Sequence, residues 1–272
     1  MTDDGAAPQG IDAHIPNAAR MYDYFLGGKD NFPIDREAAE RVLKVAPEAR
    51  ELARRNRAFM RRAVRHLVSE AGIRQFVDIG TGLPTKGNVH EVAAEVDPGT
   101  RVVYVDNDPV VLTHSRALLS NATNTVTVRG DLRDPEDILT NPELEALLDF
   151  SEPVAVLLVA VLHFLPDSDK PGDLIRRLRD GLPEGSYLVM SHVTAEERAG
   201  AAHLGASVYS RASAAVTLRS RARISELFDG FELVEPGLVR LDEWHPEPDA
   251  SSGDFGGKEL PTWFLCGVGR AL

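Results

Sequence analysis

Five short runs rich in apolar and β-branched residues alternate with stretches of helical periodicity along the middle of the chain. The stretches between the runs, such as NVHEVAAEV and PGDLIRRLRDG, have the length and spacing of single helices. Strands and helices that alternate in this way predict right-handed βαβ units and a mainly parallel sheet. The five runs are QFVDI (75–79), RVVYV (101–105), TVTV (125–128), PVAVLLV (153–159) and SYLVM (186–190).

The first quarter of the chain shows helical periodicity without strand-like runs. One helix is predicted over PNAARMYDYFLGG, a second from Asp35, whose side chain we expect to cap it, and a third from Pro47 to Gly72. One stripe of the third helix is apolar, and we expect its other faces to be mostly solvated. These faces carry Arg50, Arg54, Arg55, Arg57, Arg61, Arg62 and Arg65.

The pattern divides the chain into parts that we expect to form one compact domain overall. Residues 1–15 are predicted to be a disordered N-terminus, 16–72 a helical cap, and 73–272 the core. Within the core, residues 193–228 are predicted to be a helical segment on the substrate side. Two terminal strands are expected near FELVEPGLV and TWFLCGVG, and the Pro-, Gly-, Ser- and Asp-rich stretch 245–260 between them predicts a mobile loop.

Composition narrows the class of protein. Hydrophobic residues at 43% and charged residues at 26% are ordinary globular values, and the net charge of -12 disfavours a general nucleic-acid binder. The single cysteine, Cys266, excludes an internal disulfide framework and favours a reducing compartment. The first residues do not form a secretory signal, and no apolar run has the length of a membrane span. We therefore expect a cytoplasmic protein without a nucleic-acid or membrane partner and without a metal site, and the oligomeric state stays open.

The segment FVDIGTGLPT (76–85) has the form of a strand that runs into a nucleotide-binding turn. The P-loop pattern fails because lysine precedes glycine in TGLPTKGN. A dinucleotide fingerprint would need its third glycine at Thr85, and a helix that begins at once so that its N-terminus meets a pyrophosphate. Here the capping-box spacing of Asn88 and Glu91 predicts a helix that begins late, six residues beyond Gly82.

A third interpretation is a loop that binds S-adenosylmethionine (SAM), whose pattern is acid-x-Gly-x-Gly. SAM has an α-amino group, a carboxylate and a sulfonium but no phosphate, so a carboxylate at Asp78 is acceptable near its amino-acid end. Gly80 and Gly82, with Thr81 between them, would let the backbone approach the cofactor closely. These residues by themselves leave both SAM and a dinucleotide open.

Acidic residues follow the next two predicted strands. Asp106 lies at the carboxyl end of the second strand, with Asn107 beside it, where an acid can accept hydrogen bonds from both ribose hydroxyls of SAM or of NAD. Asp131, followed by Leu132, comes after the third strand, where it could accept a hydrogen bond from the adenine amine. Dinucleotide folds do not usually require this acid. Asp131 therefore favours SAM, although RDPED could equally be a turn that starts a helix.

The fourth strand leads into the reacting end of the predicted site. Val159 and Ala160 should border the cofactor there, because ligands in such sheets bind beyond the carboxyl ends of the strands. His163 is a candidate general base, and His192, after the fifth strand, is a second candidate for the same role. A lone histidine after a strand is more often a packed structural residue, so both roles stay open.

These motifs together resemble the class I SAM-dependent methyltransferases: Asp78-x-Gly80-x-Gly82, Asp106, GDLRDP and VLHFLPD occur in the expected order. More narrowly, PNAARMYDYFLGGKDNF joined to FVDIGTGLPT, NVHEV and VVYVDNDPVVL resembles a mainly actinobacterial family of S-adenosyl methyltransferases with no defined substrate. The resemblance extends from about Pro16 to Gly269. Pro84, where broader methyltransferases have a third glycine, is shared by this narrower family.

The resemblance implies an α/β, Rossmann-like, seven-stranded and mainly parallel sheet, with the last strand antiparallel, helices on both faces and an N-terminal helical cap. It implies SAM as cofactor and S-adenosylhomocysteine as product. It also implies that Tyr22, in the Tyr22-Asp23 pair, helps to close the site and that Lys29 meets the cofactor carboxylate.

The expected function is SAM-dependent methyl transfer to an unidentified small-molecule acceptor. The alternatives are a non-catalytic sensor that binds SAM or S-adenosylhomocysteine, and, less favoured, an NAD-dependent oxidoreductase. No Asn/Asp-Pro-Pro-aromatic string follows the fourth strand, so methylation at O, N or C stays open. Four arginines could face an anionic acceptor or be solvated: Arg211, Arg219, Arg221 and Arg223.

Overall fold

The computed structural model describes residues 14–246 and 263–272, apart from Lys86, residues 120–121, residues 197–198 and Arg211. The predictions of disorder in residues 1–15 and of a mobile loop over 245–260 therefore fall almost entirely outside the described residues.

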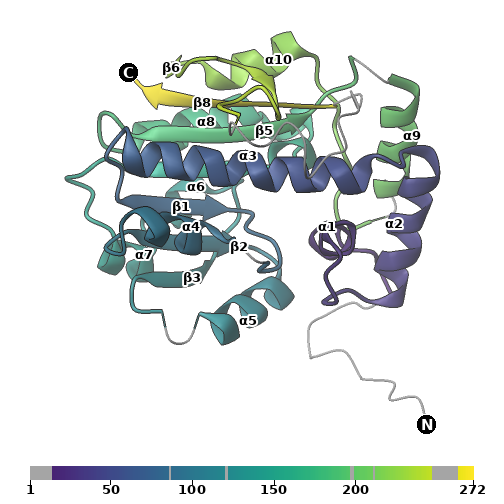
Figure 1. Ribbon diagram of the computed structural model, residues 1–272, viewed down its shortest axis with the longest axis horizontal. Coiled ribbons are helices and arrows are strands. Elements are labelled where there is room, and N and C mark those ends of the chain that lie inside the picture. Colours follow the sequence, from purple (N-terminus) through teal and green to yellow (C-terminus); the bar gives the residue numbers. More distant parts are fainter. Residues whose placement is uncertain (1–13, 86, 120–121, 197–198, 211, 247–262) are drawn as a thin grey trace.

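A twisted eight-stranded sheet forms the centre of the fold, in the order β3-β2-β1-β4-β5-β8-β6, with β7 also paired to β8 (Figure 1). The first five strands are parallel, and β8 runs antiparallel to β5, β6 and β7. The expected α/β class, parallel core and antiparallel last strand are confirmed. The strands are β1 (Gln75–Ile79), β2 (Arg101–Asp106), β3 (Thr125–Arg129), β4 (Ala155–Val159), β5 (Tyr187–Val193), β6 (Phe231–Leu233), β7 (Val239–Arg240) and β8 (Phe264–Ala271).

The strand count exceeds the expected seven because FELVEPGLV forms two strands, β6 and β7. Pro236 has no amide hydrogen for a ladder, and Gly237 has φ +87°, a left-handed conformation that turns the chain. Both short strands pair with β8 on either side of this turn.

Helices cover both faces of the sheet. One apolar cluster joins α3 (Ala49–Ser69) and α4 (Val89–Val96) to Phe76 of β1, and a second joins α6, α7 and α8 to Val77 of the same strand. Successive side chains of a strand point to opposite faces, so β1 is buried on both. The remaining core helices are α5 (Pro109–Leu118), α6 (Pro135–Leu139), α7 (Pro142–Leu147), α8 (Pro171–Asp180) and α10 (Arg221–Ser225), with short 3-10 turns at Leu162–Phe164, Asp167–Asp169 and Glu226–Phe228.

The N-terminal helices α1 (Ala18–Leu26) and α2 (Pro33–Val45) gather beyond one end of the strands, next to α9 (Ala199–Tyr209), while α3 lies across the sheet (Figure 1). Helix α2 begins at Pro33, two residues before the expected start. Proline suits the first position of a helix, where no amide hydrogen is needed. Asp35 still caps this end, but from inside the first turn, because its Oδ2 accepts a hydrogen bond from the Phe32 N–H at 2.8 Å.

The arginines of α3 do not form a solvated face, contrary to expectation. Arg55 is buried and pairs with Glu51 and with Asp242 at 2.5 Å, and Arg62 donates to the carbonyl of Trp244 at 2.9 Å. These contacts fasten the segment that follows β7 onto α3. Of the seven, Arg50 and Arg54 are exposed residues, and the side chain of Arg65 is 40% exposed.

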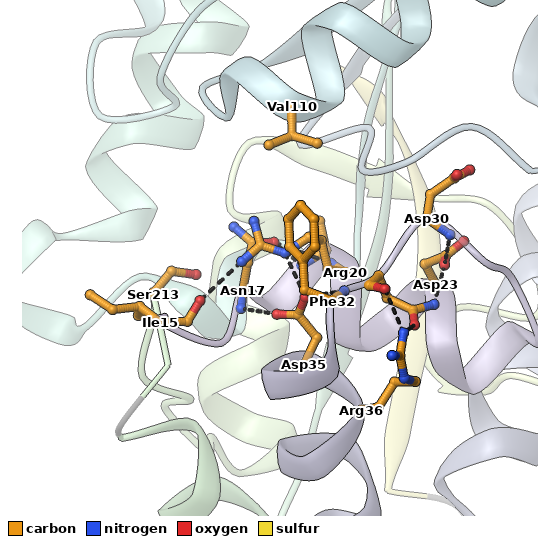
Figure 2. A network of polar contacts seen from close by, with 12 residues as sticks. Ile15, Asn17, Arg20, Asp23, Asp30, Phe32, Asp35, Arg36, Val110 and Ser213 are labelled. Carbon is orange, nitrogen blue, oxygen red and sulfur yellow. Dashed lines mark hydrogen bonds and ion pairs between the residues drawn. The ribbon is translucent and has the colours of Figure 1, made fainter. Parts of the chain in front are cut away.

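A buried ion pair holds the cap together. The Nε of Arg20 donates to Oδ2 of Asp35 at 2.7 Å, and both side chains are almost fully buried (Figure 2). Asn17 connects this pair to the core: its backbone N–H donates to Asp35 at 2.8 Å, and its Nδ2 donates to Asp108, at the start of α5, at 2.6 Å. The cap is therefore tied to the loop that follows β2.

Replacing Arg20 by methionine is expected to lower the free energy of unfolding by about 3 kcal/mol, because it leaves the carboxylate of Asp35 buried without its cation. Arg50→Met is the matched control, since Arg50 and Glu40 form a pair with both side chains nearly half exposed, and it should cost less than about 1 kcal/mol. Urea unfolding of both variants measures the difference. Equal losses in the two variants would contradict the assignment.

Candidate functional site

A cavity of about 620 Å³ lies between the carboxyl ends of the parallel strands and the cap helices. Its size is within the range of roughly 300–1,000 Å³ that is usual for ligand sites. Lys29 is exposed and is not among the residues that line the cavity. The other predicted site residues all line it: Tyr22, Asp78, Gly80, Thr81, Gly82, Asp106, Asn107, Asp131, Leu132, Val159, Ala160 and His163.

The glycine loop after β1 is shaped so that only glycine fits. Gly80 has φ +70°, and a Cβ at this position would lie 2.6 Å from the side chain of Val161. Gly82 has φ +65°. Because α4 begins only at Val89, no helix N-terminus directly follows the loop. The loop thus offers closely approachable backbone to a ligand that has no phosphate.

Asp106 is fixed at the end of β2. Its Oδ2 accepts a hydrogen bond from the Gly82 N–H at 3.0 Å, and its Oδ1 accepts one from the Asp108 N–H at 2.9 Å. Burial raises the pKa of Asp106, and these two hydrogen bonds partly offset that effect. Each carboxylate oxygen can accept a further hydrogen bond. The group is suited to two adjacent hydroxyls, such as those of a ribose.

Asp131 lies at the neighbouring strand end. It accepts hydrogen bonds from Asn107 Nδ2 at 3.1 Å and from the Arg133 N–H at 3.0 Å. Partial burial would raise the pKa of Asp131, but these donors and the charge of Arg133 bring it below the ordinary value. A charged acceptor that can face the edge of an adenine therefore borders the cavity, with the buried side chain of Leu132 beside it.

Asp78 and Arg57 bring opposite charges to the same part of the cavity. Burial raises the pKa of Asp78 to about 6, although the charge of Arg57 and a hydrogen bond from Thr81 act against the rise. Arg57, from α3, donates to the carbonyl of Gly87 and to Asn88, and it forms no ion pair with a carboxylate of the described residues. Together, Asp78 and Arg57 match the ammonium and carboxylate of an amino acid.

Sequence reasoning missed Arg57 because seven arginines share its helix. A signal was present in the spacing: Ala49, Ala53, Asn56, Arg57 and Met60 lie on one face of α3, and all line the cavity.

A chain of hydrogen bonds, in which each group donates to the next, runs from the end of β4 to the cap. The N–H of Ala160 donates to Ser191 Oγ at 2.9 Å, and Ser191 donates to Asn56 Oδ1 at 2.6 Å. Asn56 Nδ2 donates to the hydroxyl of Tyr22 at 3.0 Å, and Tyr22 donates to the carbonyl of Ala53 at 3.1 Å. Ala160 has φ +60°, so the chain supports a strained residue on the cavity wall.

The two candidate histidines differ in their surroundings. His163 is 4% exposed, lines the cavity, and its buried Nδ1 has no hydrogen-bond partner among the described residues. Burial, together with the nearby His192 and Arg219, holds its pKa well below the ordinary value. His192 is occupied on both nitrogens: Nδ1 lies 2.7 Å from the carbonyl of Val193 and Nε2 lies 2.8 Å from Arg219 Nη1. Only His163 is placed to meet a ligand.

The described arginines after α9 do not face the cavity. Arg219 is buried, pairs with Asp167 at 2.8 Å and donates to the carbonyls of Leu162 and Leu165. Arg221 donates to the carbonyl of Leu238, and Arg223 pairs with Glu226. Arg211 lies outside the described residues. Arg219 instead fastens the loop that carries His163.

The fold and this donor and acceptor set define a class I SAM-dependent methyltransferase. The chain belongs to the S-adenosyl methyltransferase family, whose model matches residues 4–271. SAM is accordingly the cofactor, and neither the non-catalytic sensor nor the NAD-dependent oxidoreductase finds support.

Two solved structures are similar along nearly their whole length. A DUF574 family protein from Streptomyces avermitilis is 43% identical, with a TM-score of 0.91, over 96% of this chain and 99% of that one. A candidate methyltransferase from Thermobifida fusca is 42% identical, with a TM-score of 0.87, over 97% and 98%. Human N-acetylserotonin methyltransferase in complex with SAM is 15% identical, with a TM-score of 0.50 over 94% and 63%, and shows the shared fold alone. No functionally curated protein matches.

Proposed function

We propose that the protein transfers the methyl group of SAM to a small-molecule acceptor that binds beside the cofactor. The main observation behind this proposal is that one cavity contains both the carboxylates at the strand ends and a second wall, formed by α9 and residues 263–264. An acceptor bound against that wall would lie next to the cofactor, screened from water by the cap helices.

Four parts of SAM can be assigned to groups on the cavity wall, and the glycine loop supplies the backbone that the cofactor approaches. We assign the ribose hydroxyls to Asp106, the adenine amine to Asp131, and the backbone approach to Gly80 and Gly82. The amino group is assigned to Asp78. Arg57, rather than the exposed Lys29, is assigned to the cofactor carboxylate, because Arg57 lines the cavity beside Asp78.

SAM supplies a methyl group that its sulfonium already activates, so the protein mainly has to position the acceptor. Such positioning contributes roughly 7–11 kcal/mol to catalysis. His163 is neutral at physiological pH because burial lowers its pKa, so a ring nitrogen can accept a hydrogen bond from the acceptor and take its proton. The chain from Ala160 to Tyr22 holds the cap over this end of the cavity.

The activity is tested by supplying labelled SAM with a metabolite extract. We expect labelled product from the wild type, and His163→Phe should reduce its formation by roughly 10²–10⁴-fold where the acceptor must lose a proton, with SAM affinity unchanged. His203→Phe, on the exposed face of α9, is the control and should behave as wild type. Bound SAM without labelled product would favour the sensor.

We also propose that the protein works in the cytoplasm on a small molecule rather than on a nucleic acid. The net charge of -12 and the free, buried thiol of Cys266 support this setting. Within the described residues, no helix combines the length and the apolarity that crossing a membrane needs.

A further inference from the structure

We infer that the methyl acceptor is a neutral, ring-bearing small molecule. This inference rests on the proposed function. The N-terminal and C-terminal halves of the chain contribute different kinds of side chain to the cavity wall. Every charged residue that the described part of the chain contributes to the wall lies at or before Arg133. From Val159 onward none of the described lining residues is charged, because burial keeps the pKa of His163 well below its ordinary value.

The charged groups on the wall are already assigned or engaged. Asp78, Asp106, Asp131 and Arg57 match parts of SAM. The others have partners in the protein: Arg20 with Asp35, Asp23 with Asn31, Asp108 with Asn17, and Arg133 with Asp169. In the complex with S-adenosylhomocysteine, which has no sulfonium, an anionic acceptor would therefore lose its hydration without gaining a cation from the described residues, at a cost of several kcal/mol. A cationic acceptor would find no carboxylate among the described lining residues from Val159 onward, and in the SAM complex it would face the sulfonium.

Ring-bearing side chains lie on the uncharged wall among aliphatic and small residues. The rings of Phe164 and Tyr209 are 5.8 Å apart, the rings of His163 and Phe264 are 6.0 Å apart at 85°, and Trp263 lies on the same wall. These distances are typical of favourable aromatic contacts. Such a wall offers faces and edges against which a planar ring can pack.

Helix α9 leaves room for this ring. Ala202, Gly205, Ala206 and Tyr209 line the cavity at a spacing that places them on one helical face, whereas Leu204 is 55% exposed. A Cβ at Gly205 would lie 4.0 Å from the ring of Trp263. The three small residues therefore bound the space between α9 and the aromatic wall.

Two buried polar atoms on this wall have no partner among the described residues: Nδ1 of His163 and Nε1 of Trp263. Each side chain is more than nine-tenths buried. A buried polar group without a partner costs about 1–3 kcal/mol. Both groups are uncharged, so their preferred partner is a neutral polar substituent, such as a hydroxyl, on an otherwise apolar molecule.

Calorimetry on protein saturated with S-adenosylhomocysteine tests the inference with three probes that share a naphthalene ring: 2-naphthol, 2-naphthoate and 2-naphthylmethylammonium at pH 7.5. We expect 2-naphthol to bind at least tenfold more tightly than either ion. Ala206→Phe should weaken naphthol binding at least tenfold while leaving the affinity for S-adenosylhomocysteine within twofold, and Leu204→Phe, on the exposed face of α9, should change neither.

The inference would be overturned if either ion bound more tightly than 2-naphthol, or if the three probes bound equally or not at all. It would also be overturned if Ala206→Phe bound 2-naphthol as tightly as the wild type. Failure of the proposed function gives a different result, because wild-type protein would then not bind S-adenosylhomocysteine or would form no labelled product from SAM.

Discussion

Asp106→Ala is expected to weaken SAM binding by roughly 10²–10⁴-fold while the protein stays folded. Hydrogen bonds to a charged acceptor contribute about 1.5–3 kcal/mol each, and Asp106 is assigned one to each ribose hydroxyl. The variant also frees the N–H of Gly82, which the carboxylate holds at 3.0 Å. Isothermal calorimetry with SAM measures the loss, and circular dichroism checks the fold.

Asp137→Ala is the matched control for this prediction. Asp137 is exposed in the first turn of α6 and does not line the cavity. Its removal should leave SAM affinity unchanged. Undiminished affinity in Asp106→Ala would mean that the ribose binds elsewhere.

Asp78→Asn is expected to stabilise the protein without cofactor and to weaken SAM binding. The pKa of Asp78 is about 6 in the folded protein, above its ordinary value of about 3.9. The stability that the protonated carboxyl provides is therefore fully present below about pH 4 and is lost as the pH rises through 6. At pH 7.5 the variant should be more stable than the wild type by up to about 3 kcal/mol.

Cofactor binding should show the opposite trend with pH. The wild type should bind SAM more weakly as the pH falls below 6, because Asp78 then loses the charge that meets the amino group. Asp78→Asn should bind weakly throughout. Thermal unfolding and calorimetry between pH 4.5 and 8 measure both quantities. The control is Asp173→Asn, a position whose side chain is about half exposed. A variant less stable than the wild type at pH 7.5 would contradict the burial argument.

Local sequence patterns were sufficient to predict the sheet and the position of the cavity. Each parallel strand is a short run rich in apolar or β-branched residues, and residues that follow such strands must meet at one edge of the sheet. This is why residues as distant in sequence as Asp78, Asp131 and His163 could be expected at one site. The late start of α4 was also predictable from the capping-box spacing of Asn88 and Glu91. The structure contains the expected hydrogen bond, in which Glu91 accepts from the Asn88 N–H at 2.9 Å.

The features that the sequence did not predict depend on pairing between residues that are far apart in the chain. Arg55 and Arg62 have the spacing of a solvated helix face, but their partners are about 180 residues away in the segment after β7. Arg219 is likewise neutralised by Asp167 on another loop. Whether Lys29 or Arg57 faces the cavity depends on how the cap packs on the sheet. The helical spacing groups Arg57 with Asn56 and Met60 on one face of α3, but it does not show that this face meets the cavity.

A crystal structure of the protein with S-adenosylhomocysteine tests most directly whether one cavity holds both cofactor and acceptor. The ribose hydroxyls should lie within hydrogen-bond distance of Asp106, with the amino-acid end between Asp78 and Arg57. Space should remain between the cofactor sulfur, His163 and α9. A cofactor that binds away from Asp106, or that fills the cavity up to α9, would contradict the proposed arrangement.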